Sequence, residues 1–122
     1  MCGIVGFLDT SRRRGTEELR DIVLGMANRL HHRGPDDSGT WVEAAAGIAL
    51  GHRRLSILDL SPLGHQPMHS ASGHYVLSFN GEIYNFKALR GKLEDLGHSF
   101  RGHSDTEVML ACFSRWGVHQ AV

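Results

Sequence analysis

The sequence contains few cysteines and no long apolar run. Its 122 residues include two cysteines, Cys2 and Cys112, which are too few for a disulfide framework and form no CxxC pair of the kind that binds zinc. No stretch approaches the roughly 18 apolar residues of a membrane-spanning helix, and the short apolar run behind Met1 lacks the basic start of a signal peptide. These absences predict one domain in the reducing cytoplasm, with no membrane partner.

An excess of charge of either sign is also missing. The 13 Lys and Arg residues balance the 13 Asp and Glu residues, so nothing indicates a nucleic-acid partner. The nine histidines form no HExxH motif, and Pro67 between His65 and His69 prevents those two from sharing a helix face. No metal site is therefore expected.

The first half of the chain has the pattern of a strand, a helix and two further strands. Residues 3–9 form a short β-branched apolar run that is typical of a buried strand. The helix is predicted to have Thr16 as its N-cap and to end before Gly34 and Pro35. Its apolar positions recur at helical spacing: Leu19, Ile22, Val23, Met26, Ala27 and Leu30. The segments expected next are a loop over 33–39 (RGPDDSG) and strands near 40–44 and 47–52.

The second half predicts one more strand region and two helices. Alternation around residues 75–79 is typical of a strand. Asn85 is expected to cap a helix that ends at Gly97, and residues 99–102 (SFRG) to form a short strand. Residues 104–107 match the S-x-x-E capping box of a last helix, whose apolar face comprises Val108, Cys112 and Trp116. This order of elements favours an α+β fold in which helices pack on largely antiparallel sheets.

Cys2 has two interpretations. It is either the ragged end of the first strand or a nucleophile that becomes the first residue once an aminopeptidase removes Met1. In the second case the thiol lies beside its own free α-amine, whose pKa is roughly 7.7–8.0. Such an amine is a base near neutral pH, so the nucleophile needs no separate histidine.

Five stretches in a fixed order resemble one enzyme family. They are MCGIVG at the start, HRGPDDSG (32–39), GHRRLSILD (51–59), NGEIYN (80–85) and SDTE (104–107). Together they resemble the N-terminal glutaminase domain of class II glutamine amidotransferases, and most of all that of the glutamine-hydrolysing asparagine synthetases. The resemblance runs from residue 1 to residue 122. It implies an N-terminal-nucleophile hydrolase fold, an αββα sandwich of antiparallel sheets with helices packed outside.

The resemblance implies catalytic roles for three residues. Cys2 would attack the side-chain amide carbon of L-glutamine, with its own α-amine as proton acceptor. The Asn80 side chain and the Gly81 backbone N–H would form the oxyanion hole. Ammonia would leave, and water would release glutamate from a γ-glutamyl thioester on Cys2.

The resemblance also implies a binding site for the amino-acid end of glutamine. Arg54 would bind the α-carboxylate, for which a planar guanidinium is suited. Asp105 would bind the α-ammonium, and Glu82 would also contact this end of the substrate. The segment behind Arg54 would line the site through Leu55, Ser56, Ile57 and Leu58.

The same residues have plain structural interpretations. The sequence NG after a strand is the strongest short signal for a hairpin turn. Without the other motifs, surface charge is the default interpretation of Arg53 and Arg54, and Asp105 is explained as a first-turn acid that the helix dipole favours. The capping box already accounts for Ser104 and Glu107, so we leave these two out of the expected site.

Members of this family type continue into further strands and into a second domain that binds ATP and Mg²⁺ and receives the ammonia. The resemblance implies no cofactor or metal for the glutaminase half. Residues 1–122 are therefore expected to be a C-terminally incomplete glutaminase domain with open strand edges that favour self-association. Two alternatives stay open: an inactive relic or module that binds glutamine or a partner chain, and an amidotransferase whose acceptor is a sugar or peptide carboxylate instead of aspartate. A redox role of Cys2 would lack a nearby resolving cysteine and would leave NGEIYN unexplained.

Overall fold

The computed structural model describes residues 1–56 and 61–122, and the chain divides into two compact units. The sheet unit comprises residues 1–56, 65–67 and 78–80. The helical unit comprises the other described residues. Each unit has its own hydrophobic core.

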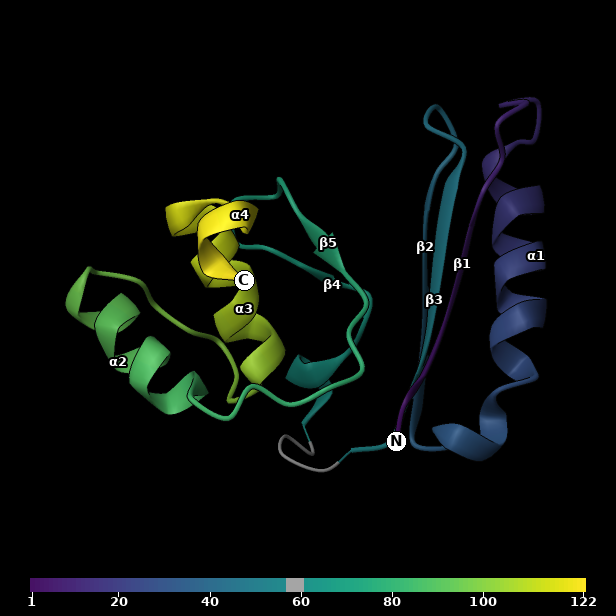
Figure 1. Cartoon of the computed structure of the whole chain (residues 1–122). Coiled ribbons are helices and arrows are strands. Elements are labelled where there is room, and N and C mark those ends of the chain that lie inside the picture. Colours follow the sequence, from purple (N-terminus) through teal and green to yellow (C-terminus); the bar gives the residue numbers. More distant parts are fainter. Residues whose placement is uncertain (57–60) are drawn as a thin grey trace. The chain divides into compact units, whose positions relative to one another are not determined.

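The sheet unit is built on three antiparallel strands, β1 (Gly3–Leu8), β2 (Asp37–Glu43) and β3 (Ile48–Arg54), with β3 in the centre (Figure 1). The strands predicted from residues 3–9, 40–44 and 47–52 are thereby confirmed. The expectation that the first of them is buried is wrong, because β1 lies at the edge of the sheet and Ile4 and Leu8 are exposed. The loop predicted over 33–39 is wrong at its end, because Asp37, Ser38 and Gly39 already pair with β3. Composition alone favoured a loop there, but the backbone pairing outweighs it.

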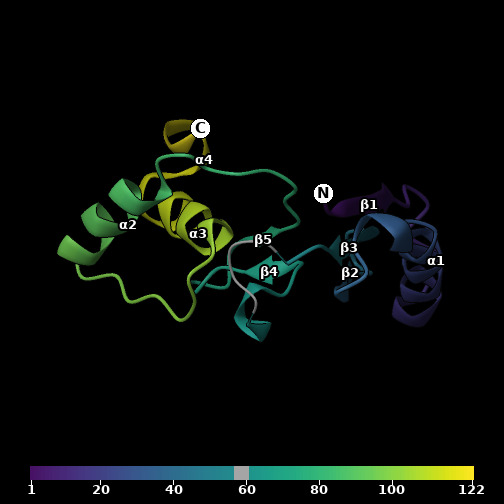
Figure 2. The ribbon, with the colours of Figure 1, turned by 90° about the horizontal axis from the view of Figure 1, so that it is seen from below.

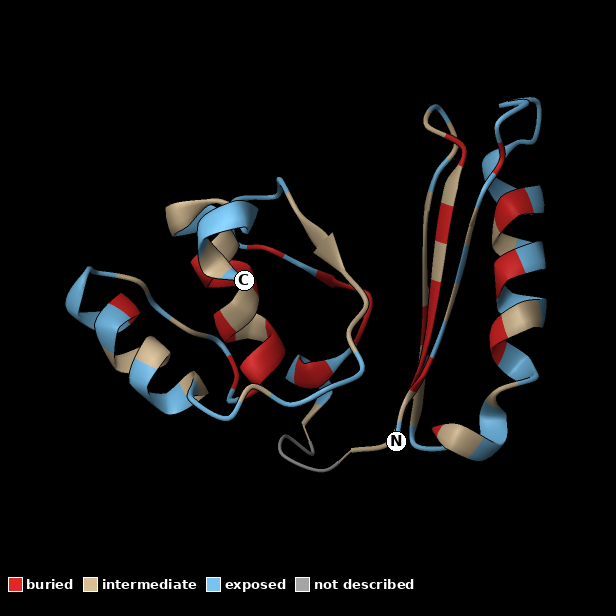
Figure 3. Ribbon diagram, in the orientation of Figure 1, coloured by how far each residue is buried: buried red, intermediate tan, exposed pale blue. Residues whose placement is uncertain are grey.

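Helix α1 (Thr16–Asn28) lies along one face of this sheet, as Figure 1 and Figure 2 show. Leu19, Val23 and Ala49 form the fully buried core between helix and sheet. The predicted apolar face is too wide, because Ile22 is exposed and only the stripe at four-residue spacing is buried (Figure 3).

Both predicted ends of α1 differ from the structure. The N-cap is Gly15, and Thr16 is the first helical residue. At the other end the helix stops at Asn28, and a short 3-10 turn, η1 (His31–Arg33), precedes Gly34. The glycine and proline therefore end the turn and not the helix itself.

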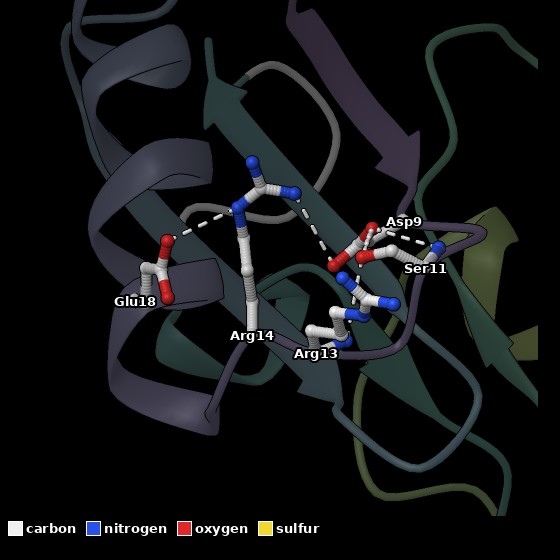
Figure 4. A network of polar contacts seen from close by, with 5 residues as sticks. All are labelled: Asp9, Ser11, Arg13, Arg14 and Glu18. Atoms are coloured by element: carbon white, nitrogen blue, oxygen red, sulfur yellow. Dashed lines mark hydrogen bonds and ion pairs between the residues drawn. The ribbon is translucent and has the colours of Figure 1, made fainter.

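A polar network joins the end of β1 to the start of α1 (Figure 4). The Asp9 carboxylate accepts hydrogen bonds from the hydroxyl of Ser11 at 2.6 Å and from its backbone N–H at 3.1 Å. The hydroxyl bond, opposed by burial, lowers the pKa of Asp9. Arg14 forms ion pairs with Asp9 at 3.3 Å and with Glu18 at 3.0 Å. The connection between strand and helix is thus held by local charge.

The helical unit has its core between α2 (Phe86–Asp95) and α3 (Asp105–Trp116), followed by the short α4 (Val118–Ala121). Its fully buried members are Leu93, Val108, Ala111 and Cys112. Trp116 packs against this cluster, which confirms the apolar face predicted for the last helix. Asn85 and Gly97 flank α2 as predicted, and Gly97 has the positive φ of +90° that favours glycine behind a helix.

Two strand predictions in this half need correction. A short 3-10 turn, η2 (Pro62–Gly64), precedes the hairpin of β4 (Met68–His69) and β5 (Val76–Leu77). Of the strand predicted at 75–79, only the two residues of β5 pair with β4. Residues 99–102 form no strand, because the Glu107 carboxylate binds the N–H groups of Arg101 and Gly102, each at 2.8 Å.

The architecture is α+β, with antiparallel sheets and helices, as the sequence predicts. Within the described parts of the chain, no helix has the length and apolar character needed to cross a membrane.

Candidate active site

Cys2 lies at the end of the sheet, directly before β1. Gly3 pairs with Arg53, so the same antiparallel register places Cys2 across from Arg54. The Leu55 N–H donates to Cys2 Sγ at 3.3 Å, and Sγ lies 3.6 Å from the Leu55 carbonyl oxygen. The N–H directs a partial positive charge at the sulfur, which suits a group that becomes anionic.

The RGPDD segment holds both sides of this end of the sheet. Arg33 Nε donates to the Cys2 carbonyl at 3.2 Å, and Asp36 Oδ2 accepts from the Ser56 N–H at 2.8 Å. Gly34 is required between them, because an added Cβ would lie 2.4 Å from the carbonyl carbon of Arg53. In the sequence, only the charged motif itself indicates these contacts.

Arg53 and Arg54 are both buried, each 8% exposed, so their interpretation as surface charge is wrong. Arg53 Nε donates to the Gly34 carbonyl at 3.1 Å, and its guanidinium also contacts His31 Nδ1. Arg53 therefore has a structural role. Arg54 ends β3 between β1 and β2, on the same face of the sheet as His52.

Asn80 is exposed and belongs to the sheet unit. The hairpin interpretation of Asn80 and Gly81 is wrong, because neither has a positive φ and the next regular element is α2. The residue before them, Phe79, is held by two side chains. Its N–H donates to Gln66 Oε1 at 2.6 Å, and its carbonyl accepts from His52 Nε2 at 3.2 Å. This explains why β5 ends at Leu77.

His52 is only 1% exposed, and burial lowers its pKa. The Phe79 carbonyl opposes this by favouring the proton on Nε2. Nearby, His65 Nδ1 lies 2.7 Å from Asp37 Oδ2. His52 and His65 therefore have structural partners within the sheet unit.

Three of the predicted site residues belong to the helical unit. Gly81 and Glu82 are exposed, whereas Asp105 is 6% exposed at the first position of α3. Asp105 Oδ2 accepts the Ile83 N–H at 2.9 Å, so this carboxylate holds the segment that follows Glu82. Ser104 caps the helix by accepting the Glu107 N–H at 3.3 Å, as predicted.

The sheet unit thus brings Cys2, Arg54, Leu55 and Ser56 to one end of β3. The helical unit brings Asp105 to the segment behind Gly81 and Glu82. Ile57 and Leu58, also predicted to line the site, lie outside the described residues. In the described parts of both units, no group of three His, Cys, Asp or Glu side chains could hold a metal ion.

Comparison with known proteins agrees with the resemblance that the five sequence motifs indicate. The family model described as "Glutamine amidotransferase domain" matches residues 1–122. An asparagine synthetase [glutamine-hydrolyzing] 2 of Bacillus subtilis is 39% identical over 118 residues, which are 97% of this chain and 15% of that protein. Asparagine synthetase B [glutamine-hydrolyzing] of Escherichia coli is 40% identical over 117 residues, 96% of this chain and 20% of that protein. The amidase chry2 of Gibberella zeae is 35% identical over 125 residues, 97% of this chain and 18% of that protein. The chain therefore spans a fifth or less of the length of these relatives.

Proposed function

We propose, from the premise that the chain belongs to the glutamine amidotransferase domain family, that it hydrolyses L-glutamine to glutamate and ammonia with Cys2 as the nucleophile. The observation that carries this proposal is the placement of the thiol. Cys2 Sγ accepts a hydrogen bond from the Leu55 N–H at 3.3 Å. Leu55 directly follows the buried Arg54, the last residue of β3.

The proposed reaction begins with removal of Met1, which is 75% exposed. The free α-amine of Cys2 takes the thiol proton, and the thiolate attacks the side-chain amide carbon of glutamine. The amine returns the proton to the leaving nitrogen, the C–N bond breaks, and ammonia departs. Water then attacks the thioester carbon, giving glutamate and restoring the thiol.

The remaining site residues would stabilise charge and bind substrate. The side-chain NH₂ of Asn80 and the N–H of Gly81 would donate to the oxyanion of the tetrahedral intermediate. Arg54 would bind the α-carboxylate bidentately, and Asp105 the α-ammonium together with Glu82. The segment of Leu55, Ser56, Ile57 and Leu58 would line the site. Thiol, amine and amide donors supply the chemistry of this half, so we assign it no cofactor or metal.

We also propose the N-terminal-nucleophile αββα fold for the domain. In a longer protein the ammonia would serve the ATP- and Mg²⁺-dependent amidation of aspartate, which the names of the asparagine synthetase relatives support. ATP and Mg²⁺ would then bind outside residues 1–122. An acceptor carboxylate on a sugar or a peptide, in place of aspartate, stays the alternative. Cytoplasmic location and self-association stay predictions.

A diazoketone analogue of glutamine tests the proposal. Intact-mass and peptide mass spectrometry should show loss of Met1 and one adduct on Cys2 that excess glutamine prevents. Cys112→Ala is the matched control, because Cys112 is buried in the helical core and its loss should leave the adduct in place. Retention of Met1, or an adduct only on Cys112, would refute the proposed role of Cys2. Tight glutamine binding without glutamate release would identify a binding module instead.

A further inference from the structure

In the sheet unit, buried side chains hold both backbone polar groups of one residue, Phe79, which belong to two consecutive peptide groups. Gln66 Oε1 accepts the Phe79 N–H at 2.6 Å, and His52 Nε2 donates to the Phe79 carbonyl oxygen at 3.2 Å. His52 is 1% and Gln66 8% exposed. Neither bond belongs to a strand ladder or a helix, so regular secondary structure does not account for them.

The two holding residues are themselves fixed to the sheet. His52 is a residue of the central strand β3, where it pairs with Ile4 and Gly39. Gln66 is pressed against β2, because a Cβ added to Gly39 would lie 2.1 Å from the Gln66 carbonyl oxygen. The Phe79 backbone is therefore tied to the same three-stranded sheet that places Cys2.

The consequence falls on the next residue. The Phe79 carbonyl shares one rigid plane with the N and Cα atoms of Asn80, because the peptide bond is planar. A fixed carbonyl oxygen therefore restrains the position of Asn80 Cα, to which the side chain is attached. We propose that His52 and Gln66 are positioning residues that set the location of Asn80, an inference that rests on the proposed oxyanion role of Asn80.

The chemistry of His52 agrees with this role. A carbonyl oxygen can only accept, so Nε2 carries the proton. Nδ1 is buried and has no hydrogen-bond partner among the residues that the structure describes. A second proton would therefore leave a buried donor unsatisfied, and the ring acts as a neutral donor to Phe79.

Matched variants of His52 separate positioning from packing. His52→Gln keeps an N–H donor of similar reach, whereas His52→Leu removes it. We expect His52→Leu to lower kcat by roughly 10- to 100-fold with little change in KM, as for a misplaced catalytic group. His52→Gln should recover most of that loss. Val23→Ala is the control, because it weakens the core between α1 and the sheet and should lower Tm without changing kcat.

A double-mutant cycle gives the decisive outcome. If His52 acts through Asn80, His52→Leu should change kcat little when Asn80 is already alanine. Additive losses, or failure of His52→Gln to recover activity, would overturn the proposal.

If His52→Leu does not fold, Gln66→Met tests the hold on Phe79 from the other side. It removes the acceptor for the Phe79 N–H, so hydrogen exchange of that amide should become faster and kcat should fall. Unchanged exchange would refute the hold on Phe79. A wild-type chain with a protected Phe79 amide and no glutamate release would refute the proposed function while leaving the hold on Phe79 in place.

Discussion

The two units hold their candidate site residues by different means. In the sheet unit, pairing between strands far apart in the sequence places Cys2 beside Leu55 and across from Arg54. In the helical unit, Asp105 is placed by the start of a single helix, and its bond to Ile83 orders an irregular segment. The first arrangement depends on strand register and the second on one side-chain contact.

This difference determines how each unit should respond to mutation. A slip of one residue in strand pairing turns every side chain to the other face, so the placement of Cys2 tolerates no change of register. A helix start can lose one side-chain contact and still form, because the core of α2 and α3 is separate. Backbone changes should therefore matter most in the sheet unit, and charge changes in the helical unit.

Cys2→Ala should have the largest effect. It removes the nucleophile, so glutamate release should fall to the uncatalysed level while glutamine binding stays largely intact. A coupled glutamate assay and calorimetric titration measure the two properties. Loss of both would show that Cys2 supports the pocket and not only the reaction.

Asn80→Ala should lower kcat by about 10²–10³, the usual cost of one oxyanion donor. Asn80 is exposed, so Tm should change little. Steady-state kinetics at saturating glutamine measure the loss. An unchanged rate would reduce Asn80 to a connecting residue.

Asp105→Asn sharpens the comparison in the helical unit. An amide oxygen still accepts the Ile83 N–H, but the negative charge is gone. KM for glutamine should rise roughly 10- to 100-fold, which corresponds to about 1.5–3 kcal/mol for a hydrogen bond to a charged group. Thermal unfolding should be nearly unchanged, whereas Asp105→Ala should also lower Tm. If KM stays the same in Asp105→Asn, the carboxylate only anchors the segment.

Gly39→Ala tests the backbone of the sheet unit. The added Cβ would lie 2.1 Å from the Gln66 carbonyl oxygen, so backbone must move, at a cost of about 1–3 kcal/mol in the free energy of unfolding. Gly25→Ala is the control, because Gly25 lies within α1 with nothing within 4 Å of its added Cβ. Urea unfolding should show that this second variant is more stable by about 0.5–1 kcal/mol. A tolerated Gly39→Ala would contradict the close packing of Gln66 on β2.

The pH dependence of stability should show the smallest effect. Burial lowers the pKa of His52 below its ordinary value of 6.5, so the unfolded chain binds a proton that the folded chain does not. Stability from this group is fully present above pH 6.5 and falls as the pH drops below it, by at most about 1.4 kcal/mol per pH unit. Denaturation at pH 7.5 and 5.5 should show a smaller difference for His52→Gln than for the wild type. Equal differences would assign the slope to other groups.

Hydrophobic periodicity was enough to predict the three strands of the sheet unit and the helices behind Gly15, Asn85 and Ser104. It failed where side chains take over backbone groups. Phe79 is held by Gln66 and His52, which shortens β5. Residues 99–102 are held by Glu107, which replaces the predicted strand.

The sequence predicted the residues of the candidate site but not their contacts. Motif order indicated Cys2, Arg54 and Asp105, but it could not indicate which backbone groups they meet. The bond from Arg33 to Cys2 spans 31 residues, and the one from His52 to Phe79 spans 27. No local pattern encodes such pairs, because they arise only when strands and loops pack together.

The contact between Cys2 and Leu55 also implies an order of events during synthesis. The two residues are 53 positions apart. At about 5–20 residues per second, the ribosome needs roughly 3–10 seconds between them. Until Leu55 has been made, the chain cannot form its contact with Cys2. The mechanism that we propose would then favour removal of Met1 before the chain folds around its thiol.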